Sequence, residues 1–190
     1  MRLIVVSSPV FLANEATLLN KMFALGMEIL HLRKPNASEK DCAELLENID
    51  NQYHTRISIH QHFQLCKRYC LKGVHLNSRY SDANGFEHLG VSKSCHNLLE
   101  LSDIDKFEYV FLSPIFDSIS KQNYKSAFTE KDLQKAKSNS LINRKVIALG
   151  GVNSATFPLL EAMGFGGGAV LGAIWNSKSP VESFKHLKML

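Results

Sequence analysis

The feature that most constrains the fold of this chain is a regular alternation of short apolar runs with amphipathic segments along its 190 residues. Apolar runs of this length are typical of strands, and the amphipathic segments are typical of helices. Eight runs are predicted as strands: Leu3–Ser8, Glu28–Arg33, Arg56–Gln61, Gly73–Asn77, His88–Ser92, Tyr109–Ile115, Lys145–Gly150 and Gly168–Ile174. The predicted helices are Glu15–Ala24, Ser38–Asn51, Phe63–Tyr69, Thr129–Lys137, Ser154–Met163 and Val181–Leu187.

Strands that alternate with helices favour a parallel sheet with right-handed crossovers. Eight such units favour an α/β fold closed into a (β/α)8 TIM barrel, with one domain over residues 1–190. A doubly wound open sheet is the alternative if one of the eight strands is false. In a barrel the chemistry takes place at the carboxyl ends of the strands. Asp117 is the only acid there, so glycoside hydrolysis, which requires two carboxylates, is disfavoured.

Composition excludes several classes of protein. The net charge of +4 comes from scattered basic residues rather than a concentrated stripe, so nucleic-acid binding is disfavoured. No apolar run approaches the roughly 20 residues that span a bilayer, and the N-terminus resembles a first strand, so we expect a cytoplasmic protein. No cysteine belongs to a CxxC pair, which disfavours a zinc knuckle or a redox motif.

The segment Leu112–Tyr124 carries the clearest indication of chemistry. It begins as an apolar strand, breaks at Pro114, and continues into a loop with Ser118, Ser120 and Lys121. Hydroxyl and ammonium groups both bind phosphate oxygens, which indicates an enzyme that handles phosphorylated small molecules. A polar surface loop is the alternative interpretation.

Glycine turns lie beside two of the later strands. Gly150 and Gly151 follow an apolar strand, where exposed amides before a helix near Ser154 would suit an anion, or where the turn would merely be tight. Gly166–Gly168 precedes the last strand and is expected to shape the far rim of the barrel. Gly172 lies at the catalytic end, where the lack of a side chain would let a phosphate approach the backbone.

The second strand ends in His31, Arg33 and Lys34. Consecutive strand residues face opposite ways, so at most one of Arg33 and Lys34 points into the mouth together with His31. An arginine at that position suits a diphosphate, although a surface salt bridge is the alternative. His60, His62 and His75 raise a metal hypothesis, but no carboxylate joins them and their spacing matches no known ligand pattern.

Taken in order, six motifs resemble the thiamine phosphate synthase family, which includes a TenI-like thiazole tautomerase branch. The resemblance covers nearly the whole length. The motifs are GMEILHLRK (Gly26–Lys34), KGVHL (Lys72–Leu76), LGVSKSCH (Leu89–His96), YVFLSPIFDSISK (Tyr109–Lys121), VIALGGV (Val146–Val152) and GGAVLGAI (Gly167–Ile174).

The resemblance implies a barrel that joins a pyrimidine diphosphate to a thiazole phosphate and releases pyrophosphate. Departure of the diphosphate would leave a pyrimidine cation, which the thiazole nitrogen attacks. Two phosphorylated small molecules are therefore the implied partners, and a homodimer is compatible with a barrel of this size. Any Mg2+ would arrive with the substrate diphosphate.

The family's site residues carry over to matching positions. Ser118 and Ser120, with Ile119 between them, match the loop that meets the thiazole phosphate, and Lys121 matches a lysine that contacts the leaving diphosphate. The remaining matches give catalytic roles to Arg33 and Ser92, and substrate contacts to His31, Lys34, His60, Gly150, Gly151, Leu171 and Gly172.

Departures from the family pattern fall on the pyrimidine-diphosphate half. Gln61 and Tyr80 stand where the family has the two aspartates that hold magnesium, which prefers carboxylate oxygens. Pro35 occupies the position of a lysine, although Lys34 is adjacent. Loss of these charges would weaken stabilisation of the departing diphosphate.

Two alternatives to a full synthase follow. His31 and the missing aspartates are similar to the tautomerase branch, but that branch has a catalytic histidine where this chain has Pro114, so His31 or His60 would have to replace it. The other alternative is a regulatory protein that binds the thiazole phosphate or thiamine phosphate without turnover.

Overall fold

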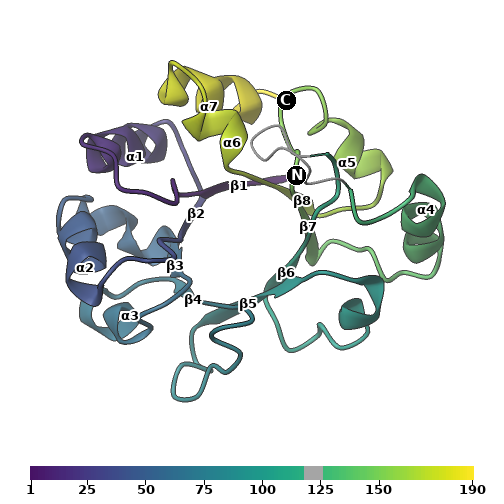
Figure 1. Ribbon diagram of the computed structural model, residues 1–190, viewed down its shortest axis with the longest axis horizontal. Coiled ribbons are helices and arrows are strands. Elements are labelled where there is room, and N and C mark those ends of the chain that lie inside the picture. The colour runs from purple at the N-terminus through teal and green to yellow at the C-terminus, as the bar shows by residue number, and fades with distance from the viewer. Residues whose placement is uncertain (118–125) are drawn as a thin grey trace. The chain divides into compact units, whose positions relative to one another are not determined.

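The structure is a computed structural model that describes residues 1–117 and 126–190. Four predicted site residues, Ser118, Ile119, Ser120 and Lys121, lie outside the described residues. Eight strands follow one another in chain order around a closed barrel (Figure 1). The strands are β1 (Arg2–Val6), β2 (Ile29–Leu32), β3 (Ile57–Ile59), β4 (Gly73–Leu76), β5 (Gly90–Cys95), β6 (Tyr109–Leu112), β7 (Val146–Leu149) and β8 (Gly167–Val170).

The predicted (β/α)8 barrel is thus confirmed, and the open sheet is excluded. The helices are α1 (Glu15–Ala24), α2 (Glu39–Glu47), α3 (Gln64–Tyr69), α4 (Glu130–Ser138), α5 (Leu159–Ala162), α6 (Gly172–Trp175) and α7 (Pro180–Lys188), with 3-10 turns η1 (Asn51–Arg56) and η2 (Leu98–Leu101). Within the described ranges, no helix combines the length and the apolar character that crossing a membrane requires.

The chain divides into two compact units, and each is described separately below. The N-terminal unit is Val5–Val91, and the C-terminal unit is Met1–Ile4 together with Ser92–Leu190. One domain over residues 1–190 stays a prediction.

In the N-terminal unit, β2, β3 and β4 are parallel, with His31 opposite Ser58 and Ser58 opposite Gly73. Figure 1 shows α1, α2 and α3 along one side of these strands. The start of α2 follows from its sequence, because Ser38 and Asp41 form a reciprocal capping box. The unit's core includes Leu19, Met22 and Phe23 of α1, which are buried at helical spacing.

In the C-terminal unit, β6, β7 and β8 are parallel and fully buried except at one strand end. Gly166 and Gly168 have structural roles, as the sequence indicated. A Cβ on Gly166 would lie 2.0 Å from the Arg144 carbonyl oxygen, and one on Gly168 would lie 2.7 Å from Leu160 Cδ1. The glycines therefore permit close packing of the chain before β7 and of α5 against β8.

Two predicted segments of the C-terminal unit have different structures. The helix predicted over Ser154–Met163 is reduced to α5, which directly follows Pro158, a residue with no amide N–H to donate to the Ser154 carbonyl oxygen. The strand predicted over Gly168–Ile174 ends at Val170, and its last residues form α6.

Other element boundaries also differ from the predicted ones, and two examples follow. The strand predicted over His88–Ser92 is β5, which begins at Gly90 and runs on to Cys95. The helix predicted over Ser38–Asn51 ends at Glu47, where Asn48 donates from its side chain to the Glu44 carbonyl oxygen at 2.8 Å. This bond satisfies a carbonyl of the last helical turn and ends α2.

Candidate functional site

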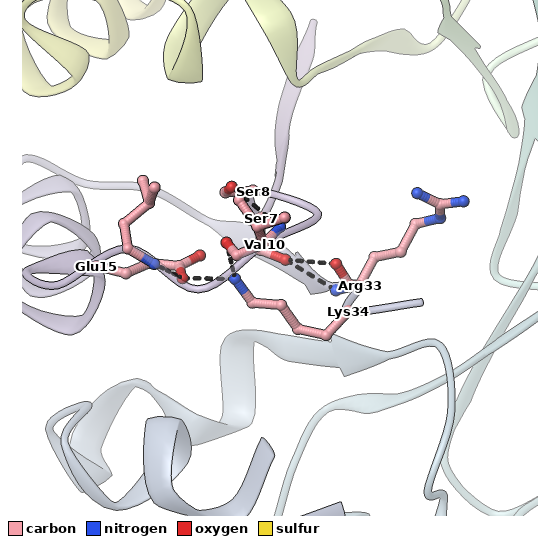
Figure 2. Close-up of polar contacts among 7 residues, drawn as sticks. Ser7, Ser8, Val10, Glu15, Arg33 and Lys34 are labelled. Carbon is pink, nitrogen blue, oxygen red and sulfur yellow. Dashed lines mark hydrogen bonds and ion pairs between the residues drawn. The ribbon is translucent and has the colours of Figure 1, made fainter. Parts of the chain in front are cut away.

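Arg33 and Lys34, which follow β2, leave the chain in opposite directions (Figure 2). The Arg33 side chain is exposed, as alternation along a strand predicts for one of two neighbours. Its backbone is held by Ser7, whose hydroxyl accepts from the Arg33 amide at 2.9 Å and donates to the Arg33 carbonyl oxygen at 3.1 Å. Ser7 is fully buried, so it positions the end of β2 rather than binding a substrate.

Lys34 lies in a buried ion pair. Its ammonium is 2.5 Å from a Glu15 carboxylate oxygen at the start of α1 and donates to the Val10 carbonyl oxygen at 2.8 Å. Burial raises the pKa of Glu15 and lowers the pKa of Lys34, and their mutual hydrogen bond opposes both shifts. Each side chain is only 1% exposed. The Lys34 ammonium therefore already has two partners, Glu15 and Val10. The substrate contact expected of Lys34 stays a prediction.

His31, His60 and His75 form a buried cluster on three neighbouring strands. The His31 Nδ1 and His60 Nε2 atoms are 2.9 Å apart and share a hydrogen bond. The rings of His60 and His75 are stacked, with centroids 4.1 Å apart. Burial lowers the pKa of all three imidazoles, that of His75 to about 3, so the cluster is neutral at neutral pH.

This cluster differs from the histidine set that the sequence indicated. His62 adopts a left-handed conformation with φ 53°, and its Nε2 contacts the Ala37 carbonyl oxygen at 3.0 Å instead. Its place is taken by His31, which the strand register sets opposite Ser58, two residues before His60 on the same face. The sequence could have indicated His31, because its position along the strand sets which face it lies on once the register with β3 is known.

Gln61 and Tyr80, the two positions where the resemblance predicts magnesium aspartates, do not fit Mg2+. The Gln61 amide nitrogen donates to the Lys34 carbonyl oxygen at 2.6 Å, and Tyr80 forms an isolated bridge with Asn77. The nearby Asp82 carboxylate accepts from the amide and the side chain of Asn84. An amide and a phenol are poor replacements for the carboxylate oxygens that Mg2+ prefers.

A second guanidinium, which sequence reasoning passed over, accompanies Arg33. Partial burial of the guanidinium first, and then the positive charge of Arg79, lower the pKa of Arg33. Arg79 donates to the Pro35 carbonyl oxygen at 3.2 Å, which holds it beside the end of β2. Two like charges held together gain most from an anionic ligand between them. The sequence feature that could have indicated Arg79 is its position just beyond the carboxyl end of β4.

In the C-terminal unit, Gly150 and Gly151 lie directly against the segment that precedes the predicted phosphate-binding residues. The Phe116 amide donates to the Gly150 carbonyl oxygen at 3.1 Å. Both glycines have positive φ, 92° and 66°. A Cβ on Gly150 would lie 2.9 Å from Pro114, and one on Gly151 would lie 2.5 Å from the Asp117 carbonyl oxygen. Only glycine combines this backbone with this approach.

The base of the loop is closed by hydrogen bonds. The Ser126 amide donates to the Asp117 carboxylate at 2.8 Å, and the Ser126 hydroxyl donates to the Ile115 carbonyl oxygen at 2.8 Å. The Gly151 carbonyl oxygen accepts from the Thr156 hydroxyl at 3.1 Å. Within the described residues, no hydrogen bond uses the amide N–H of Gly150 or Gly151, so these donors suit an anion.

The other predicted residues of this unit lie at its strand ends or within its strands. Leu171 follows β8, and Gly172 begins α6, instead of extending the strand. Ser92 is buried inside β5, two residues after the start of the strand. Ser94 shares its face by alternation, is half-buried, and lies nearer the carboxyl end. The role of Ser92 stays a prediction.

Comparison with known proteins gives a consistent assignment. The family "Thiamine monophosphate synthase" matches residues 2–174. A thiamine phosphate pyrophosphorylase from Bacteroides thetaiotaomicron is 36% identical, with a TM-score of 0.89, and the match covers 99% of this chain and 96% of that one. One from Pyrococcus furiosus has a TM-score of 0.81 at 17% identity, with 99% and 94% covered, which shows the fold alone.

Curated relatives carry the same description at lower identity. A thiamine-phosphate synthase from Yersinia pestis (strain Pestoides F) is 26% identical over 167 residues, which cover 82% of this chain and 77% of that protein. One from Vibrio parahaemolyticus is 29% identical over 102 residues, and the match spans about half of each chain, 54% and 49%. A family match over residues 2–174 and the barrel it accompanies lead to one conclusion: this chain belongs to the thiamine monophosphate synthase family.

Proposed function

We propose that this protein is a transferase that joins hydroxymethylpyrimidine diphosphate to thiazole phosphate, giving thiamine phosphate and pyrophosphate. The observation that supports this most is the likeness, at 36% identity over 99% of the chain, to the Bacteroides thiamine phosphate pyrophosphorylase. In this reaction the bond from the pyrimidine methylene carbon to the diphosphate oxygen breaks first. The thiazole nitrogen then forms the new bond to that carbon.

In the proposal, the C-terminal unit binds the thiazole phosphate. The amides of Gly150 and Gly151 donate to its oxygens, and Leu171 and Gly172 provide a second turn. The hydroxyls of Ser118 and Ser120 and the ammonium of Lys121 belong to the same proposed contact, with Lys121 reaching the leaving diphosphate. The hydrogen bond from Ser126 to Asp117 supports this assignment, because it ties the two ends of that loop beside the glycine turn.

The N-terminal unit supplies positive charge for the leaving group. Arg33 and Arg79 lie close enough for the charge of one to lower the pKa of the other, and a diphosphate would relieve their repulsion. No step is assigned to a protein-bound Mg2+, because Gln61 and Tyr80 do not fit that ion. Diphosphate departure therefore depends on the guanidinium groups.

One observation favours a second candidate, a proton transfer on the thiazole phosphate. His31 and His60 share a hydrogen bond of 2.9 Å and are both neutral, so one nitrogen can give a proton while the other ring accepts one. A tautomerase of this kind needs no diphosphate and no magnesium. It would use the same thiazole-phosphate contacts.

A single set of assays separates these functions. The full chain is incubated with both substrates and with each alone, with and without Mg2+, while pyrophosphate, thiamine phosphate and the thiazole isomers are followed. Pyrophosphate released only when both substrates are present supports the synthase, and isomer conversion without the pyrimidine supports the tautomerase. Saturable binding of thiazole phosphate with neither activity would mean a regulatory binding protein, and absence of binding would contradict all three.

Two sets of variants sharpen the assay. Arg33→Gln should lower synthesis strongly, whereas Arg68→Gln, on an exposed surface ion pair, should leave the rate unchanged. The double change Gln61→Asp and Tyr80→Asp should raise Mg2+-dependent synthesis. If that double variant is no faster, the lost carboxylates are not what limits the reaction.

A further inference from the structure

We propose that His31, His60 and His75 bind one divalent transition-metal ion of the zinc class. One nitrogen from each ring can be chosen so that all three lie within 4.8 Å of one another. The three residues come from β2, the end of β3, and β4, which are neighbours within the N-terminal unit. The metal site shares His31 and His60 with the predicted substrate contacts, but the proposal does not depend on the synthase function.

The His31 and His60 nitrogens are spaced nearly as in a tetrahedral zinc site, and the set that includes His75 lies within 4.8 Å. Zinc–nitrogen bonds of about 2.05 Å place two ligand nitrogens about 3.3 Å apart. The His31 and His60 nitrogens are already 2.9 Å apart. Binding would replace their hydrogen bond with two metal bonds, and the shared proton would move to the other nitrogen of the ring that carries it. No proton need leave the protein.

The chemistry of the donors selects the ion. Neutral imidazole suits zinc, cobalt, nickel and copper, whereas magnesium requires hard oxygen ligands. Burial of all three rings keeps them neutral, which is the form that binds a metal. The resemblance places magnesium aspartates of the family at the positions of Gln61 and Tyr80. A transition metal at the histidine cluster would therefore not replace that magnesium.

The backbone around the cluster is held in place. The Asn77 side-chain nitrogen donates to the His60 carbonyl oxygen at 3.0 Å and to the His75 carbonyl oxygen at 3.4 Å, so one side chain joins the ends of two ligand strands. Three protein ligands leave a fourth position open, as in catalytic zinc sites. The positive charge of Arg33 acts on His60 and His75, so the fourth ligand is expected to be an anion.

Cobalt is the probe for this site, because tetrahedral Co2+ has visible absorption bands that zinc lacks. The full chain without a histidine tag is treated with EDTA, dialysed, and titrated with Co2+. We expect one equivalent of Co2+ to bind with intense bands of a four-coordinate nitrogen site, and one equivalent of Zn2+ to remove them. An excess of Mg2+ should not. Absence of stoichiometric binding, or bands of octahedral cobalt, would overturn the proposal.

Variants assign the ligands. His60→Asn should weaken Co2+ binding by at least about tenfold, since even changes around metal ligands cost about 10- to 100-fold. His62→Asn is the matched control, two residues away and outside the cluster, and should bind like the parent. Equal losses in both variants would refute the assignment. If His60→Asn does not fold, the cobalt spectrum of the parent and a rise in its melting temperature with Zn2+ still decide the matter.

Discussion

The carboxyl ends of the strands carry different kinds of groups in the two units. In the N-terminal unit they carry buried or paired side chains, such as the three histidines and the Lys34–Glu15 pair. In the C-terminal unit they carry a glycine turn whose backbone lies against the start of a loop. The first arrangement depends on which side chains are present, and the second on what the backbone can adopt.

This difference bears on where we predict departures from the family pattern. Side-chain chemistry changes with single substitutions, and the departures predicted at Gln61 and Tyr80 fall in the N-terminal unit. A turn that only glycine can form is constrained by geometry, because any side chain would meet Pro114 or Asp117. The C-terminal unit therefore keeps the features expected of a phosphate site.

The largest effect is expected from breaking the buried ion pair. Lys34→Ala leaves the Glu15 carboxylate buried without its partner and should lower the free energy of unfolding by about 3–5 kcal/mol. Urea unfolding measures this. Arg68→Ala breaks an exposed pair with Glu47 and should cost less than about 1 kcal/mol. Equal losses would show that Lys34 and Glu15 are not enclosed as described.

Next is the glycine turn, with a control from the other unit. Gly151→Ala combines a left-handed backbone with contact to Asp117 and Phe116, so it should cost about 2–5 kcal/mol. Gly85 also has positive φ, 80°, but a Cβ there meets nothing within 4 Å. Gly85→Ala should lower the free energy of unfolding by only about 1–2 kcal/mol, because it adds the cost of a left-handed backbone without a close contact. If the two losses are the same, the close approach at Gly151 is not real.

The histidines predict a pH dependence of stability in metal-free protein. Histidines of the unfolded chain take up protons near pH 6.5, whereas folded His75 does so only near pH 3. Between these values the unfolded state holds more protons, so stability falls as pH falls, by about 1.4 kcal/mol per pH unit for each such histidine. Above pH 6.5 the effect disappears.

Denaturation in EDTA at several pH values measures this slope. His75→Gln removes one of the three histidines and should reduce the slope by about 1.4 kcal/mol per pH unit. His186→Gln, at an exposed position on α7 of the C-terminal unit, is the control that leaves the buried cluster intact. A slope that does not respond to His75→Gln would mean that this ring is not buried.

The smallest effect concerns the base of the phosphate loop. Asp117→Ala removes the hydrogen bond from the Ser126 amide and should cost about 1 kcal/mol. Asp82→Ala removes a similar bond from the Asn84 amide in the N-terminal unit, at a similar cost. Only Asp117→Ala should also weaken thiazole-phosphate binding, measured by calorimetry. Equal affinities of the two variants for thiazole phosphate would show that the loop takes no part in binding the phosphate.

The barrel was predictable because its signals are local. Apolar runs gave all eight strands, and Ser38 with Asp41 marked the start of α2. The helix predicted over Ser154–Met163 was too long, because Pro158, which has no amide N–H, lies within it. Glycines near the last strand were assigned correctly in their structural role but not in the strand boundary at Gly172.

The candidate site was less predictable, because it depends on distant partners. Nothing in the segment around Lys34 indicates that Glu15, 19 residues earlier, would meet its ammonium. His62 was expected among the clustered histidines, but its left-handed backbone turns it toward Ala37. The residues 118–125, on which much of the phosphate prediction rests, lie outside the described part of the chain.

The Lys34–Glu15 pair also limits how this sequence can change over generations. Replacing either residue alone passes through a protein with a stranded charge in its interior, which selection against unfolded chains would remove. Two simultaneous replacements, or a stabilising change acquired beforehand, would be needed to escape. Descendants of this gene should therefore keep both residues or lose both, so that the residue at position 34 predicts the residue at position 15.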